Sequence, residues 1–215
     1  ALTVAGTSSF TTSADNADIT LNTATNDFTG EVSFTTAGTS GNVTVVDASA
    51  FELDTSTING NLSLTANGSI TDKNDGVITV TGTADLINQG SNNHTVDVTD
   101  GWHMWGDTVT LYGHHAKVAS GGAIKLGNIT ATAGQVVIIT RGDVTQTATS
   151  SITSHNDTTV TAKDVSVDPD VYYDITLTNT SNDFYDDTNV GDELIITGKN
   201  VQLVSGDQIN MGAST

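Results

Sequence analysis

Aromatic and imidazole side chains gather in one short segment, where they could together bind a ligand. Both tryptophans and three of the five histidines fall between positions 102 and 115. Aromatic rings stack on sugar rings or on apolar groups of a partner, and neutral imidazoles bind metal ions. We therefore predict a recognition patch that consists of Trp102, His103, Tyr112, His114 and His115.

A second candidate site is a short acidic turn that resembles the opening of a calcium loop. In such loops oxygen ligands alternate along the chain before a glycine turn, and here Asp72, Asn74 and Asp75 precede Gly76. The distal glutamate that completes such a loop is missing, and Asp and Asn are also common turn formers. The sequence is therefore compatible with either a Ca²⁺ site or a plain turn. Ca²⁺ is the one cofactor that the sequence suggests.

Catalysis is not expected, and we assign no catalytic residues. The histidines could be combined with Asp and Ser into triads, but no nucleophile motif accompanies them. Enzymes that cleave acidic polysaccharides need clustered basic groups, whereas six Lys and Arg are spread along 215 residues. A polysaccharide-active enzyme is kept only as an alternative.

Composition limits the partners and the compartment. The formal net charge is −19, which argues against binding to nucleic acid or to an anionic membrane, because both require clustered cations. The chain has no cysteine, so disulfides do not stabilise it. The chain contains no apolar run of about 18 residues, so membrane insertion is not expected. The acidic balance fits a secreted or cell-surface protein in salt water.

Tandem repetition supplies the framework that must position these residues. Asp-Ile-Thr-Leu occurs at 18–21 and again at 174–177, and Asn-Asp-Phe follows at 26–28 and at 182–184. The separation is 156 residues, about twice 77, and a degenerate middle copy is visible. We predict one rod over 1–215 with copies at about 1–76, 77–155 and 156–215, the last incomplete.

Short strands arranged as stacked coils are predicted within each copy. Apolar residues alternate at i and i+2 in bursts separated by Gly, Asn, Asp and Thr, and no convincing helix is found. Val43 to Leu62 and Val32 to Phe51 are both 19 residues apart. This spacing predicts an all-β parallel β-helix with rungs of about 19 residues, roughly eleven rungs spaced about 4.8 Å apart. It disfavours an antiparallel sandwich or an immunoglobulin-like array.

The apolar skeleton also predicts the core. Its members are expected to stack in columns with their copies 74–77 and 156–158 residues later. They are Leu2, Val4, Ile19, Leu21, Val32, Phe34, Val43, Val45, Phe51, Leu53, Leu62 and Leu64. Trp105 is the repeat counterpart of Phe28 and Phe184, so it is interpreted as core. The alternative for the rest of the recognition patch is that it only caps a widened rung.

The motifs between Ile19 and Leu64 resemble the tandem repeats of giant bacterial surface exoproteins of the filamentous-haemagglutinin and autotransporter-adhesin type. They include Ile-Thr-Leu, Asn-Asp-Phe-Thr-Gly, Gly-Asn-Val-Thr-Val and Ile-Asn-Gly-Asn-Leu-Ser-Leu. The resemblance implies a right-handed parallel β-helix, export across an outer membrane, and a role in adhesion or biofilm structure.

Together these observations predict an extracellular structural or adhesive protein, as the stalk or passenger segment of a large bacterial surface adhesin. The first alternative is a fibre subunit that polymerises end to end, because uncapped β-helix ends can pair with another copy. The expected partners are a second copy or the continuation of a longer chain. A carbohydrate or a cell-surface receptor at the recognition patch is a further possibility.

Overall fold

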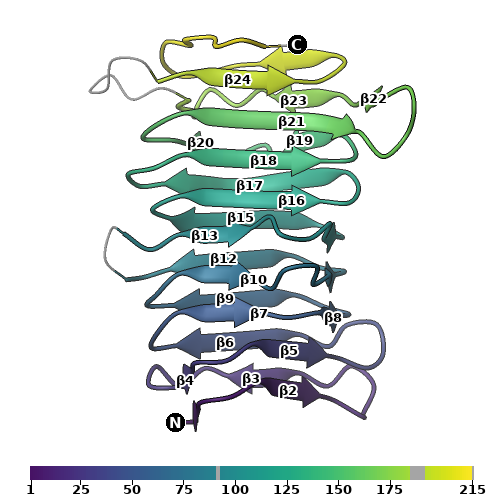
Figure 1. The fold of residues 1–215 in the computed structure, drawn as a ribbon, viewed down its shortest axis with the longest axis vertical. Coiled ribbons are helices and arrows are strands. Elements are labelled where there is room, and N and C mark those ends of the chain that lie inside the picture. Colours follow the sequence, from purple (N-terminus) through teal and green to yellow (C-terminus); the bar gives the residue numbers. More distant parts are fainter. Residues whose placement is uncertain (91–92, 185–191, 215) are drawn as a thin grey trace.

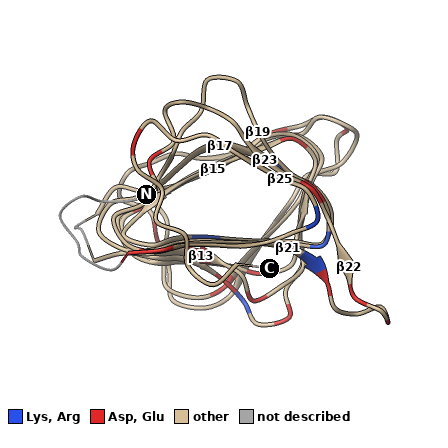
Figure 2. Ribbon diagram, turned by 90° about the horizontal axis from the view of Figure 1, so that it is seen from above, with Lys and Arg blue, Asp and Glu red and all other residues tan. Residues whose placement is uncertain are grey.

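The computed structural model is a right-handed parallel β-helix with about nine turns of about 22 residues each. It describes residues 1–90, 93–184 and 192–214, and these contain no helix. In Figure 1 the front strands run to the right and the back strands to the left while the chain climbs, which makes the coil right-handed. Seen end-on in Figure 2, the coil is a flattened oval with two long walls. No helix in the described part is long and apolar enough to cross a membrane.

The front wall of Figure 1 and its right-hand edge belong to one sheet. The strands of the front wall are β2 (Ser8–Thr11), β5 (Val32–Thr35), β7 (Phe51–Leu53), β10 (Ile70–Asp72), β13 (Val96–Val98), β16 (Ala116–Ser120), β18 (Val136–Thr140), β21 (Thr158–Asp164) and β24 (Leu194–Thr197). At the right-hand edge β8 (Ser56–Ile58), β11 (Ile78–Val80) and β14 (Met104–Trp105) continue three of the rungs. β22 (Val171–Tyr172) pairs antiparallel with β21.

The back wall is a second, entirely parallel sheet. Its strands are β3 (Ile19–Leu21), β6 (Val43–Asp47), β9 (Leu62–Ala66), β12 (Ala84–Asn88), β15 (Thr108–Gly113), β17 (Ile124–Ala131), β19 (Val144–Gln146), β20 (Ile152–Thr153), β23 (Ile175–Leu177) and β25 (Val201–Leu203). A small pair, β1 (Thr3–Val4) with β4 (Asp27–Phe28), lies at the N-terminal end.

The core is the space between the two walls, and it confirms most of the predicted apolar positions. Strand alternation turns every second side chain inward, as in β9, where Leu62 and Leu64 are buried and Ser63 is exposed. Nine of the twelve predicted residues are buried, while Val4 and Leu21 are partly buried against the core. Leu2 is 41% exposed, so its assignment to the core was wrong; it precedes β1 at the open end of the coil.

The prediction that copies stack in columns was also wrong for adjacent copies. Val32 lies in β5 of the front wall, whereas Val109, its counterpart in the next copy, lies in β15 of the back wall. The reason is the rung length of about 22 residues instead of 19, because one repeat then corresponds to about three and a half turns. Two repeats correspond to about seven turns, so Ile19 and Ile175 do share the back wall.

The repeated Asn-Asp-Phe motif has a structural role at both of its positions. Asn26 and Asn182 are buried, and each donates from Nδ2 to the carbonyl oxygen of the leucine five residues earlier, at 2.8 and 3.4 Å. The Oδ1 of each accepts a backbone N–H of an adjacent rung, from Leu2 at 2.9 Å and from Ile152 at 3.0 Å. The buried amide therefore satisfies backbone groups where the chain turns a corner.

Candidate functional site

The predicted recognition patch does not form a single surface. Trp102 and His103 precede β14 at the right-hand edge of Figure 1, whereas Tyr112 belongs to β15 on the back wall. His114 and His115 lie in the turn from β15 to β16, at the opposite edge. The short distance in sequence is misleading because the chain crosses the width of the oval between the two groups.

At the right-hand edge, His103 is fully buried instead of presenting its imidazole to solvent. Its Nε2 lies 2.9 Å from Oδ2 of Asp72, whose side chain is also buried. The backbone N–H of Ile78 donates to Nδ1 at 3.1 Å. Because Nδ1 accepts a hydrogen bond, the imidazole proton is assigned to Nε2, which donates to the Asp72 carboxylate. The Asp72–His103 pair is therefore sealed from any substrate and joins two rungs.

The two tryptophans have different environments. Trp105 is buried, as interpreted from the repeat, and its Nε1 donates to the carbonyl oxygen of Ala119 at 2.9 Å. Trp102 is half-buried, and the guanidinium carbon of Arg141 lies 3.8 Å from the centre of its ring. Arg141 in turn approaches Asp164, with Nε 3.5 Å from Oδ1. One face of the Trp102 ring is thus covered by a cation of the protein itself.

The predicted calcium turn does not gather its three oxygen ligands. Asp72 turns inward to His103, while Asn74 and Asp75 are exposed. Asp75 has φ 62°, the left-handed conformation that Asp adopts readily at tight turns. Among the described residues, no three His, Asp or Glu side chains come together as a metal site would require. Ca²⁺ binding here stays a prediction that the arrangement does not favour.

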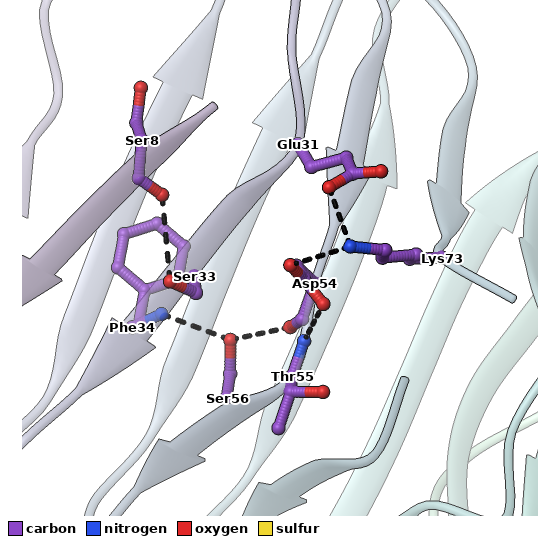
Figure 3. A network of polar contacts seen from close by, with 8 residues as sticks. All are labelled: Ser8, Glu31, Ser33, Phe34, Asp54, Thr55, Ser56 and Lys73. Atoms are coloured by element: carbon purple, nitrogen blue, oxygen red, sulfur yellow. Dashed lines mark hydrogen bonds and ion pairs between the residues drawn. The ribbon is translucent and has the colours of Figure 1, made fainter. Parts of the chain in front are cut away.

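Lys73, inside the same turn, connects rungs instead. Figure 3 shows its ammonium group between two carboxylates of earlier turns: Nζ is 2.7 Å from Oε2 of Glu31 and 3.1 Å from Oδ2 of Asp54. The backbone N–H of Thr55 and, to a lesser extent, Lys73 lower the pKa of Asp54 below 3.8. The same two carboxylates raise the pKa of Lys73 above 10.5. Ser56 extends this network by accepting the N–H of Phe34 at 3.0 Å.

Replacing Lys73 by Gln should make the protein less sensitive to acid. A carboxyl group with a lowered folded-state pKa stabilises the fold above its unfolded pKa, and this contribution disappears as the pH falls through the lowered value. We therefore expect wild type to lose more stability than Lys73→Gln between about pH 5 and about pH 2. Urea unfolding at a series of pH values measures this. Parallel curves for the two proteins would contradict the assigned interaction.

On the back wall, Tyr112 and His114 line a groove with a volume of about 740 Å³. Tyr112 is 44% exposed on the outer face of β15, between Ile87 of β12 and Thr130 of β17. His114 is half-buried at the end of the groove. The sequence pattern indicated the tyrosine and the histidine but not the rest of the groove, because the lining residues come from four successive rungs.

His115 does not line the groove, and one of its ring nitrogens is engaged in a hydrogen bond within the protein. Its Nδ1 accepts the backbone N–H of Gln135 at 3.0 Å, and its ring lies against that of His114, with centroids 4.6 Å apart. Burial, followed by the proximity of His114 and of Lys117, lowers the pKa of His115 below 6.5. His115 is therefore neutral near pH 7 and serves to join its rung to the next.

Comparison with known families adds one finding. The family model described as "Repeats of unknown function (DUF5649)" matches residues 1–35, 40–111 and 113–191, well over half of the chain. The second and third matches are each close in length to one copy of the repeat seen in the sequence. No curated protein and no solved structure matches the chain. The chain therefore belongs to this family of tandem repeats of unknown function.

Proposed function

We propose that this chain is a rod-forming segment of a secreted or cell-surface adhesive protein, acting as its stalk or passenger. The observation that carries the proposal is the continuity of the two walls. Parallel pairing links β3 through β6, β9, β12, β15, β17, β19 and β23 to β25 along the back, and the front wall has the matching series. The strands of each rung pair only with those of the neighbouring rungs, so length can be extended by adding repeats.

Polar contacts between rungs support a role in which the rod resists being pulled apart. On the back wall, Asp18 accepts the backbone N–H of Asn42 at 2.8 Å. The side chain of Asn42 accepts the N–H of Asn61 at 2.9 Å, and that of Asn61 accepts the N–H of Thr83 at 2.8 Å. Such ladders add hydrogen bonds between rungs beyond those of the strands, each worth about 0.5–1.5 kcal/mol.

Immunogold electron microscopy of intact producing cells tests the proposal. Antibodies raised against the purified chain should label the cell surface or fibres that extend from it. An antibody against a cytoplasmic protein of the same cells is the control for leakage. Label that appears only after the cells are permeabilised would show that the protein is not displayed at the surface.

A further inference from the structure

We propose that the groove on the outer face of the back wall binds a neutral oligosaccharide. The proposal deepens the adhesive role proposed above, on which it rests, by naming the chemical class of its ligand. It concerns the part of the wall formed by β12, β15 and β17, which lie side by side in Figure 1.

A backbone irregularity shapes this part of the wall. β15 and β17 change register between Val109 and Leu111, because β17 contains one extra residue there. The extra length falls at Gly127 and Asn128, and a Cβ at Gly127 would lie 2.6 Å from Oγ1 of Thr110. A larger residue at position 127 would therefore press on the side chains of Thr110 and Thr108. Such bulges redirect side chains and are frequent beside binding sites.

The groove combines an apolar platform with hydroxyl and amide groups. Ile87, Tyr112 and Thr130 are register partners on successive rungs, so the exposed tyrosine ring lies between an aliphatic side chain and a hydroxyl. Gln89 and Asn128 add amides at the rim of the groove. A sugar presents an apolar ring face together with hydroxyl groups that both donate and accept hydrogen bonds. The groove offers a counterpart to each of these features.

Charge restricts the ligand to a neutral one. Among the described residues, no Asp, Glu, Lys or Arg lines the groove, although the chain as a whole has a net charge of −19. A polyanionic ligand would be repelled by the protein as a whole, and the described lining offers neither a lysine or arginine to an anion nor a carboxylate to a cation. The volume of about 740 Å³ lies within the range of about 300–1,000 Å³ that is usual for sites of small ligands.

An extended peptide is less suitable because the backbone in this region is already paired. β15 is bonded to β12 on one side and to β17 on the other. A peptide that adds to a sheet needs a free strand edge, and this groove lies on the face of the sheet. Recognition must therefore come from side chains.

Isothermal titration calorimetry with the whole chain tests the proposal. The probes are neutral hexasaccharides of glucose, galactose, mannose, xylose and N-acetylglucosamine, with an oligogalacturonate and a Gly-Ser peptide for comparison. We expect at least one neutral hexasaccharide to bind, and Tyr112→Ala to weaken its binding by about ten-fold or more. Tyr112→Phe keeps the ring and should stay within about three-fold of wild type.

Two matched controls separate the groove from general effects. Tyr172, which is 37% exposed in β22, lies outside the groove, so Tyr172→Ala should leave the affinity unchanged. Thr130→Val should weaken binding, whereas Thr153→Val, on the next rung of the same column, should not. Thermal unfolding of each variant checks the fold.

The proposal is overturned if no neutral hexasaccharide binds at millimolar concentration, if Tyr112→Ala binds as tightly as wild type, or if the oligogalacturonate or the peptide binds best. These results leave the surface labelling of the rod unaffected. Failure of the groove and failure of the adhesive role are therefore distinguishable.

Discussion

Replacing Leu64 by Asp is expected to unfold the rod or to remove most of its stability. Leu64 is fully buried in the centre of the back wall, between Val45 and Leu86 on the adjacent rungs. Removing a buried leucine side chain costs about 2–5 kcal/mol, and a buried carboxylate without a partner adds a further penalty. Because whole domains are stable by only about 5–15 kcal/mol, one such change is decisive. Ile138→Asp should behave in the same way.

The matched control lies one residue away. Ser63 belongs to the same strand but faces outward, so Ser63→Asp places the same carboxylate in solvent. Asp85 is the register partner of Ser63 on the next rung, so the new carboxylate also meets a like charge. We expect a loss of no more than about 1 kcal/mol for Ser63→Asp and of more than about 4 kcal/mol for Leu64→Asp, measured by urea unfolding. Equal losses for the two variants would contradict the assignment of the inward face.

The strand period predicted the fold well, because alternation depends only on neighbouring residues. Phe51 and Leu53 are inward and Glu52 is outward, as their sequence indicates. The rung length was harder to predict, because the corners vary and carry no periodic signal. Val109 pairs with Ala84 on one rung and with Leu126 on the next. The number of residues from Ala84 to Val109 is about half as large again as the number from Val109 to Leu126. One uniform rung length could not represent both of these rungs.

The candidate site was less predictable because its residues come together only through stacking. The segment from Trp102 to His115 looked like one patch, but β15 carries the chain across the oval between them. Asp72 looked like an exposed metal ligand, yet its partner His103 is 31 residues away and no local pattern joins them. A buried polar pair between rungs becomes visible only when the register of the rungs is known.

The Asp72–His103 pair should make a large, coupled contribution to stability. Asp72→Ala leaves the Nε2–H of His103 buried without a partner, which costs about 1–3 kcal/mol. His103→Ala leaves a buried carboxylate and an unpaired N–H of Ile78, so we expect it to cost about 3–5 kcal/mol. Each single variant leaves the other polar group buried without its partner, and the second substitution removes that unpaired group. The double variant should therefore be more stable than the sum of the two single losses predicts.

A double-mutant cycle by urea unfolding measures this coupling, and an exposed ion pair provides the comparison. Nζ of Lys125 lies 3.0 Å from Oδ1 of Asp107, but both side chains are 49% exposed. Solvent screens such a pair, so the same cycle there should give a coupling of no more than about 1 kcal/mol. For Asp72 and His103 we expect about 1–3 kcal/mol. Additive losses at Asp72 and His103 would mean that water enters between them, and the pair would then not hold the β10 and β14 rungs together.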